Sequence, residues 1–236
     1  MICCYDDWNM NDLTIIYYTA NCISDYFMAN TQKQLLEAAR EIPIISVSQK
    51  PMALGTNICV GDSLRSHVNI YRQALIGVKK AETKYIALAE DDVLYSPEHF
   101  TRRSSAGKFA YNIGVWSFFT WSDPPMFTYK GRINLNGLIC ERELFIEAME
   151  ERFARWPDET KVNLSHWAEP GKYEKYLKVT VREIEHFYTN SPNIMFSHET
   201  ALSFGGLGTR KKAGDIRATA IPYWGTAQEI MKVYKP

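Results

Sequence analysis

Short apolar runs alternate with segments of helical character through the first hundred residues. Residues 13–18, 44–47 and 85–89 are rich in β-branched and aromatic side chains, which predicts three buried strands. Residues 31–41 have a helical composition, and residues 62–81 place apolar side chains at helical spacing. Strand, helix, strand, helix, strand is typical of a parallel sheet with helices on both faces. We therefore predict an α/β fold with a Rossmann-like, mostly parallel sheet flanked by helices.

The second half of the chain is less regular, so we predict a mixed C-terminal half. An aromatic segment at 109–121 is broken by Pro124 and Pro125. The remaining predicted elements are a loop at 50–61, strands at 132–140 and 193–197, a helix at 141–154, and a segment at 175–187 that fits either a strand or a helix.

Composition adds few constraints. The 236 residues include 27 Lys and Arg and 27 Asp and Glu, so net charge does not point to a polyanionic partner. The first twelve residues do not resemble a signal peptide, and no stretch approaches the roughly 18 apolar residues of a membrane span. The five cysteines lack zinc-finger spacing and are interpreted as free thiols. We expect a soluble, cytoplasmic protein in which residues 1–236 form a single domain.

Three consecutive carboxylates, Glu90, Asp91 and Asp92, follow the third predicted strand. Ligands of parallel α/β sheets bind beyond the carboxyl ends of the strands. Magnesium sites often use one or two carboxylates together with substrate phosphates. The triplet is therefore a candidate site for a metal that bridges a nucleotide diphosphate. The alternative is an acidic turn before a helix that starts near Ser96.

At these residues the chain resembles a known family. The segment 85–95, YIALAEDDVLY, is similar to the part of GT-A fold glycosyltransferases that ends in an Asp-x-Asp motif, although this chain has Glu-Asp-Asp. The resemblance implies a Mn²⁺ or Mg²⁺ ligand at Asp92 and a nucleotide-sugar donor, such as a UDP-sugar, near Glu90 and Asp91. The segment 13–21 is similar to the first strand of family 2 enzymes, which implies that Thr19, Ala20 and Asn21 bind the donor.

A narrower resemblance concerns the acceptor. The segments 71–100, 118–121 and 138–145 together look like phage glycosyltransferases linked to TET-like DNA base oxygenases. That resemblance implies transfer to hydroxymethylated pyrimidines in DNA, in the host cytoplasm if the protein is encoded by a bacteriophage. The broader resemblance to GT-A enzymes covers roughly residues 13–100, so we expect a nucleotide-sugar half at about 13–100 and an acceptor half at about 101–236.

Further donor and metal ligands are predicted outside the triplet. His198 follows a predicted strand, and many GT-A enzymes use a late histidine as a metal ligand; a hydrogen-bonded histidine at a strand end is the alternative. The glycine-rich segment 203–212 carries Arg210 and Lys211, which fit either a phosphate-binding loop or a surface turn. Arg65 and Arg72 are seven residues apart, so on one helix they would share a face directed to the donor or to solvent.

Acceptor-side residues are harder to choose. Trp116 and Trp121 have polar neighbours and are predicted to bind the acceptor, although core packing explains most aromatic residues. A general base is required if the enzyme inverts configuration. The candidates are Glu169, Asp123 and Glu141.

The predicted function is metal-dependent transfer of a sugar, hexosyl or pentosyl, from a nucleotide-diphosphate sugar to a hydroxyl group. The acceptor is either a hydroxymethylated pyrimidine in DNA or a glycan or protein. A nucleotidyltransferase uses a similar sheet and metal but is expected to have a glycine-rich basic loop after the first strand, which residues 19–24 lack. A binding module without catalytic activity is the third hypothesis.

Overall fold

The computed structural model describes residues 10–63, 65–163, 166–201 and 213–236. Arg210 and Lys211, the predicted phosphate contacts, lie outside these residues. No helix among the described residues is long and apolar enough to cross a membrane.

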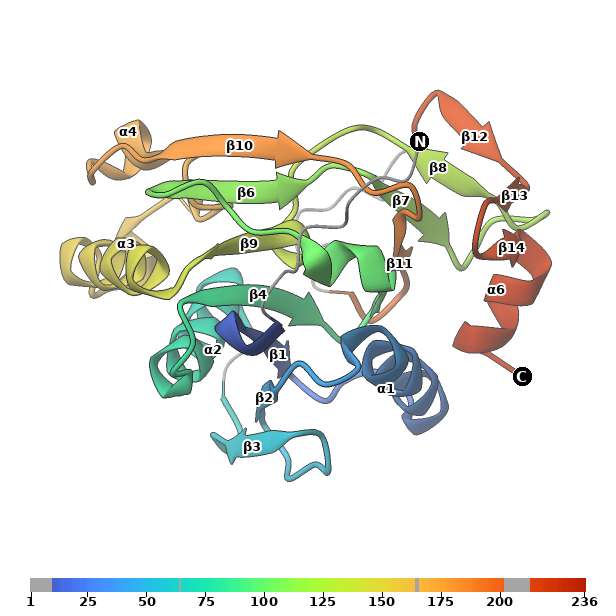
Figure 1. The fold of residues 1–236 in the computed structure, drawn as a ribbon, viewed down its shortest axis with the longest axis horizontal. Coiled ribbons are helices and arrows are strands. Elements are labelled where there is room, and N and C mark those ends of the chain that lie inside the picture. The colour runs from blue at the N-terminus through green and yellow to red at the C-terminus, as the bar shows by residue number, and fades with distance from the viewer. Residues whose placement is uncertain (1–9, 64, 164–165, 202–212) are drawn as a thin grey trace.

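A seven-stranded sheet forms the centre of the molecule, in the order β10-β6-β9-β4-β1-β2-β3 (Figure 1). The strands are β1 (Leu13–Thr19), β2 (Ile44–Ser48), β3 (Thr56–Cys59), β4 (Tyr85–Glu90), β6 (Lys108–Asn112), β9 (Leu138–Glu141) and β10 (Glu183–Phe187). Strands β3, β2, β1 and β4 are parallel, β10 is parallel to β6, and only β9 runs antiparallel to its neighbours. The predicted mostly parallel α/β sheet is therefore confirmed.

A second sheet lies beyond the ends toward which β4, β6 and β10 point (Figure 1). Its order is β12-β8-β7-β11-β5, and its strands are β5 (Val93–Leu94), β7 (Val115–Phe119), β8 (Phe127–Tyr129), β11 (Asn193–Ser197) and β12 (Ile216–Ala218). A short hairpin, β13 (Ala220–Ile221) and β14 (Gly225–Thr226), precedes the C-terminal helix. Since β5 directly follows Asp92, the acidic triplet lies at the junction of the two sheets.

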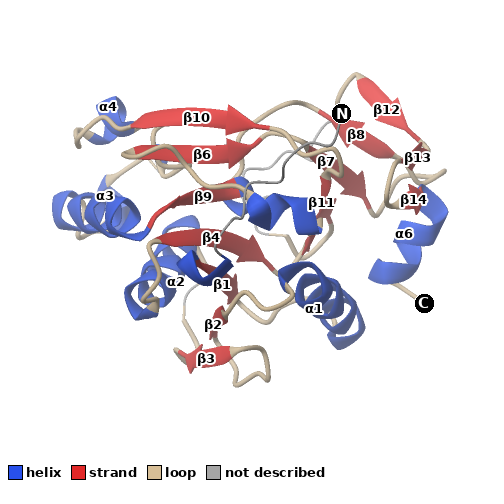
Figure 2. Ribbon diagram, in the orientation of Figure 1, coloured by secondary structure: helices blue, strands red, loops and turns tan. Residues whose placement is uncertain are grey.

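Helices cover both faces of the central sheet (Figure 2). They are α1 (Asp25–Ala39), α2 (His67–Lys80), α3 (Arg142–Arg155), α4 (Glu174–Leu177) and α6 (Ala227–Tyr234). Short 3-10 turns are η1 (Met10–Asp12), η2 (Pro97–Thr101), η3 (Leu135–Gly137) and η4 (Glu159–Lys161). Side chains of Ser24 and Ser66 accept backbone N–H bonds at the starts of α1 and α2, as N-caps do.

Alternation along β1 divides the core between the two faces. Ile16 and Tyr18 belong to the core beneath α2 and α3, whereas Leu13, Ile15 and Tyr17 belong to the core beneath α1. Full burial of one such aliphatic side chain contributes roughly 1.5–3 kcal/mol. This two-sided burial explains why β1 reads as a continuous apolar run.

Several predicted boundaries were wrong. Residues 50–61 were predicted as a loop but contain the short edge strand β3. This strand follows Gly55, whose φ is +58°. Helix α2 begins at His67 rather than near residue 62, since Ser66 provides the cap. Residues 175–187 contain both alternatives, as α4 ends within them at Leu177 and β10 follows. The expected strand at 132–140 is shortened by the turn η3.

Candidate functional site

A cavity of about 590 Å³ opens at the carboxyl ends of β1 and β4. Both halves of the chain line it. Its polar lining includes Thr19, Gln49, Arg65, Asn69, Gln73, Glu90, Asp91, Asp92, Asn136, Glu169 and His198. The position beyond the strand ends is the one expected for a ligand site of an open α/β sheet.

Glu90 faces the wall of the cavity. Its Oε1 accepts a hydrogen bond from the Tyr18 hydroxyl at 2.8 Å, and its Oε2 accepts one from Asn136 Nδ2 at 2.9 Å. Burial, together with the charge of Asp92, raises the pKa of Glu90 to about 7. Both carboxylate oxygens therefore have protein partners, and Glu90 connects β1 and β4 to the turn η3.

Asp91 points toward the end of β1. The Thr19 hydroxyl donates to Asp91 Oδ2. Burial and the neighbouring charge of Asp92 raise the pKa of Asp91 to about 6, and the hydrogen bond from Thr19 opposes that rise. Thr19 and Asp91, both predicted donor contacts, thus share one edge of the cavity.

Asp92 lies beside His198, the other predicted metal ligand. His198 Nε2 is 3.3 Å from Asp92 Oδ2, and the Phe196 amide donates to the Asp92 carbonyl at 2.8 Å. His198 Nδ1 lies 3.0 Å from the Thr200 hydroxyl, and the imidazole packs edge-on against the Phe27 ring. A partner at one ring nitrogen fixes the orientation of a metal-binding histidine and leaves the other nitrogen for the cation.

These two side chains fit a hard divalent cation. Asp92 Oδ1 is buried and has no hydrogen-bond partner, so this oxygen has ligand capacity that the protein does not use. Among the described residues, no group of three or more His, Cys, Asp or Glu side chains forms a metal cluster. Two protein ligands suit a Mg²⁺ or Mn²⁺ that takes its other ligands from substrate phosphates and water.

Part of the cavity lining is an aromatic wall. The rings of Tyr71 and Trp167 lie 5.9 Å apart between centroids, and Leu135 completes this wall. Burial raises the pKa of Tyr71 well above its usual value, so its hydroxyl stays neutral. A cavity lined by both apolar and polar side chains suits a ligand that carries both a ring and charged groups.

The three candidate bases lie in different places. Glu169 lines the cavity and forms an ion pair with Lys172 at 3.5 Å. Asp123 is exposed and is absent from the cavity lining. Glu141 lines a separate surface hollow, where Oε2 accepts a hydrogen bond from the Gly107 amide at 2.9 Å. Of the three candidate bases, Glu169 alone lines this cavity, so it is the one that we retain.

Of the two arginines predicted to bind the donor, Arg65 lines the cavity and Arg72 does not. Arg65 lines the cavity and donates to the Thr200 carbonyl. Arg72 instead pairs with Glu159 at 3.7 Å and lies over the Phe153 ring. The expectation that they share a helical face was wrong, because α2 begins after Arg65.

Asn21 has a different task from the predicted one, whereas Ala20 lines the cavity as expected. Asn21 adopts a positive φ of 51°, and its Oδ1 accepts hydrogen bonds from the amides of Gln49 and Lys50, both at 2.9 Å. Asx side chains often support left-handed turns in this way. Asn21 therefore joins the ends of β1 and β2 and is not part of the cavity lining.

Trp116 and Trp121 do not line the cavity, contrary to the acceptor role predicted for them. Trp116 packs against the Tyr129 ring on the second sheet, and Trp121 stacks on Phe119 with centroids 4.9 Å apart. Both are half-buried and pack against aromatic neighbours. Core packing, the alternative interpretation, accounts for these contacts.

Sequence reasoning missed much of the cavity wall. Tyr18, Asn136, Tyr71, Trp167 and Gln73 were not singled out, although all five line the cavity. Gln73 Nε2 donates to the Thr19 carbonyl at 3.0 Å and so holds the end of β1. The one available signal was Gln73 itself, a polar residue among the apolar positions of α2.

Comparisons with known proteins do not establish a family. No protein-family model matches the sequence, and no curated protein sequence matches it. Solved structures similar to this chain include a glycosyltransferase involved in glycosylation of the major capsid of PBCV-1, at 11% identity and a TM-score of 0.44, covering 78% of this chain and 92% of that one.

Two others are Staphylococcus aureus TarS 1–349 in complex with UDP-GlcNAc and the bifunctional IspDF from Campylobacter jejuni. TarS 1–349 is 9% identical with a TM-score of 0.42, over 80% of this chain and 60% of that one. IspDF is 12% identical with a TM-score of 0.40, over 76% of this chain and half of that one. At these values the likeness concerns the coarse arrangement of elements, and the functional argument depends on the cavity residues.

Proposed function

We propose that the chain is a glycosyltransferase that transfers a hexosyl or pentosyl group from a nucleotide-diphosphate sugar to a hydroxyl group. The adjacency of Asp92 and His198 at the carboxyl end of β4 carries the proposal. It supplies two suitable metal ligands inside a cavity large enough for a small-molecule ligand. The family resemblance of residues 85–95 supports the same chemistry.

The donor is proposed to lie along the polar edge of the cavity. Thr19, Ala20 and Gln49 line the part next to β1 and β2, where a nucleoside would bind. Arg65 lies on the same side and provides a cation for the diphosphate. The resemblance implies a UDP-sugar.

Asp92 and His198 are the residues that would hold a Mg²⁺ or Mn²⁺ ion. When bound, such an ion neutralises the negative charge of the leaving diphosphate. Asp92 supplies an anionic oxygen for this purpose, and the contact between Nδ1 and Thr200 orients the His198 ring.

Glu169 is proposed as the general base of a single displacement. Its carboxylate accepts the proton of the acceptor hydroxyl as that oxygen forms a bond to the anomeric carbon. The bond from this carbon to the diphosphate oxygen breaks, and the electron pair leaves with the nucleoside diphosphate. Tyr71 and Trp167 line the same cavity as Glu169, and we place the acceptor against this aromatic wall.

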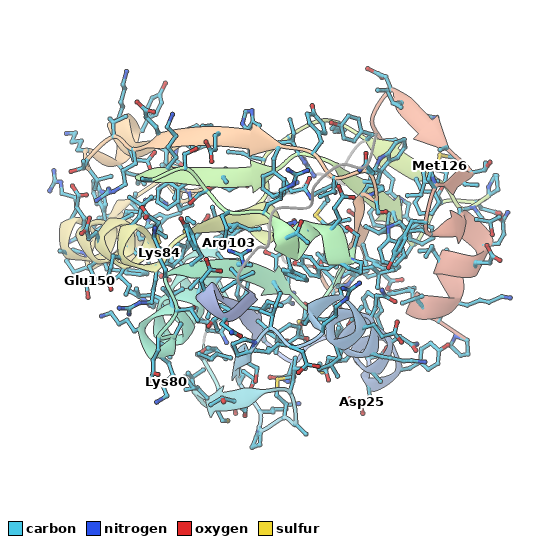
Figure 3. The ribbon with its side chains drawn as sticks, viewed as in Figure 1. Asp25, Lys80, Lys84, Arg103, Met126 and Glu150 are labelled. Carbon is cyan, nitrogen blue, oxygen red and sulfur yellow. The ribbon has the colours of Figure 1, made fainter. Side chains whose placement is uncertain are left out.

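A hydroxymethylated pyrimidine in DNA is the finer proposal for the acceptor, and the narrower sequence resemblance supports it. DNA binding needs basic side chains that can contact phosphates, and two basic residues of the second half already have carboxylate partners. Arg103 (Figure 3) is buried against Asp12, and Lys108 pairs with Glu183 at 2.9 Å. A glycan or protein acceptor therefore stays as the alternative.

A nucleotidyltransferase is less well supported. Residues 19–24 join β1 to α1 and contain no glycine, lysine or arginine that could bind a triphosphate. Among the described residues that line the cavity, Arg65 is the one lysine or arginine available to bind phosphates.

The test is incubation with a panel of sugar nucleotides, Mn²⁺, and either hydroxymethylated DNA, the free hydroxymethyl nucleoside or glycan acceptors, followed by mass spectrometry. We expect one acceptor to gain the mass of a sugar residue and the donor to yield a nucleoside diphosphate. Transfer of a nucleotide, or no reaction with any pair, contradicts the proposal. Equal transfer to DNA and to the free nucleoside counts against a DNA acceptor.

A further inference from the structure

A buried ion pair lies beneath the loop that carries Glu169. Arg152 on α3 and Glu174 on α4 are 0% and 2% exposed, and Arg152 Nη2 lies 2.8 Å from Glu174 Oε1. A buried ion pair is weak support for stability, because desolvation of both charges offsets their attraction. The role of the Arg152–Glu174 pair is therefore better judged from the hydrogen bonds that the two side chains make.

Those hydrogen bonds lead to one short loop, residues 168–171. Arg152 Nη1 donates to the Ala168 carbonyl at 2.8 Å, and the Gly171 amide donates to Glu174 Oε1. The Tyr111 hydroxyl, from β6, donates to the Pro170 carbonyl at 2.7 Å. Side chains from three elements thus hold the loop backbone on both sides of Glu169.

Gly171 shows how closely the loop is fitted. Its φ is +90°, and a Cβ atom there would lie 2.1 Å from Ile184 Cγ2. A residue with a side chain rarely adopts this conformation, and its Cβ would force Ile184 of β10 to move. The loop backbone consequently has little freedom to shift.

The same charged pair also contacts the aromatic wall. The Arg152 guanidinium lies over the Tyr71 ring, 6.0 Å from its centroid. Tyr71 and Glu169 both line the cavity. Arg152 therefore contacts one lining residue directly and holds the backbone next to the other. Reacting groups held in advance in the correct geometry accelerate a reaction because less motion is lost at the transition state.

We propose that Arg152, Glu174 and Tyr111 are positioning residues that fix the backbone of residues 168–171 and so aim Glu169 at the acceptor hydroxyl. The inference rests on the proposed transferase function. It assigns these residues an effect on turnover rather than on donor binding, because none of them lines the donor edge of the cavity.

Two variants test the inference. Tyr111→Phe keeps the buried ring and removes one anchor of the loop. The double variant Arg152→Met with Glu174→Gln removes the charges together, which avoids leaving one buried charge unpaired. The control is Glu150→Gln, labelled in Figure 3, which breaks a surface pair between α3 and Lys79 of α2.

The readouts are kcat and KM for sugar transfer, donor affinity by calorimetry, and hydrogen exchange of residues 166–174. We expect kcat to fall roughly 2- to 10-fold for Tyr111→Phe, from the loss of one hydrogen bond. The double variant should lose on the order of 100-fold, as for a reacting group misplaced by about 1 Å. Donor affinity should stay within about twofold, exchange in the loop should accelerate, and the Glu150→Gln variant should match wild type.

Wild-type kcat and loop exchange in both variants would overturn the inference while leaving the transferase proposal intact. An equal loss of donor affinity and of turnover would also overturn it, because that pattern indicates general loosening of the fold. If wild-type protein transfers no sugar from any donor, the proposed function fails, and the inference fails with it.

Discussion

His198 Nε2 lies 3.3 Å from Asp92 Oδ2, although 106 positions separate the two residues in the sequence. The pairing of strands explains the approach. Strand β11 runs antiparallel to β5, with Met195 opposite Val93, so the residues beyond β11 turn back over the acidic triplet. Two short strands of the second sheet therefore assemble the proposed metal site.

Removal of either ligand should impair transfer without unfolding the protein. We expect Asp92→Asn to lower turnover at least roughly 100-fold, because several kcal/mol of charge stabilisation would be lost. His198→Ala should have a smaller effect in the same direction. Steady-state assays with Mn²⁺, alongside circular dichroism, make the comparison, and Asp123→Asn is the matched control since Asp123 is exposed and outside the cavity. Full wild-type activity in excess chelator would refute the metal role.

Glu169 is expected to act on the chemical step. Glu169→Ala should lower kcat by roughly 10²- to 10⁴-fold, the range for loss of a general base, with little change in donor affinity. Glu141→Gln, in the separate surface hollow, should retain activity within about twofold. A Glu169→Ala enzyme with near-normal kcat would show that another group takes the proton.

His99 gives the fold a defined pH dependence. Its ring is fully buried between aromatic neighbours, and burial lowers its pKa to about 3 from an ordinary value of 6.5. The Gly114 amide donates to Asn112 Oδ1, so Asn112 Nδ2 donates to His99 Nδ1, and the neutral ring carries its proton at Nε2.

Because the folded-state pKa of His99 is depressed, its neutral form is favoured in the folded protein. Its contribution to stability is complete above about pH 6.5 and is lost as the pH falls from there toward 3, by at most roughly 1.4 kcal/mol per pH unit. Urea unfolding at pH 7 and pH 5 should therefore show a larger loss for wild type than for His99→Gln. Equal losses in the two proteins would mean that His99 does not titrate in this way.

Gly77 allows α2 to approach the central sheet. A Cβ atom at this position would lie 2.6 Å from Ile16 Cγ2 and 3.0 Å from Val47 Cγ2. Overpacking of this kind costs roughly 1–3 kcal/mol, whereas alanine gains about 1 kcal/mol in helix propensity. We expect Gly77→Ala to lower the free energy of unfolding by about 1 kcal/mol net, measured by urea denaturation. Ile76→Ala, on the exposed side of α2, is the comparison; a Gly77→Ala protein as stable as wild type would show that the side chains move aside.

Local patterns predicted the first half of the fold well. Strands β1, β2 and β4 were expected within a residue or two, since each is short, apolar and buried on both faces. Strand β3 was missed because its burial pattern is mixed and Gly55 precedes it. The acidic triplet was found because carboxylates rarely follow a buried strand without a partner.

The cavity wall could not be read from the sequence in the same way. Tyr18 is the penultimate residue of β1 and resembles any core tyrosine, yet its hydroxyl binds Glu90. Asn136 and Trp167 come from turns whose place in the cavity lining depends on tertiary packing. Asn21 shows the opposite error, because its place at a strand end suggested donor contact although its side chain stabilises the backbone.

The affinity of UDP for the protein, measured by calorimetry with and without Mn²⁺, tests the central claim most directly. Wild type should bind UDP markedly more tightly with Mn²⁺, because the ion would join the diphosphate to Asp92 and His198. Asp92→Asn should bind UDP with the same weak affinity in both conditions. Tightening by Mn²⁺ that is equal in wild type and in Asp92→Asn, or no binding of UDP to wild type at all, would contradict the account.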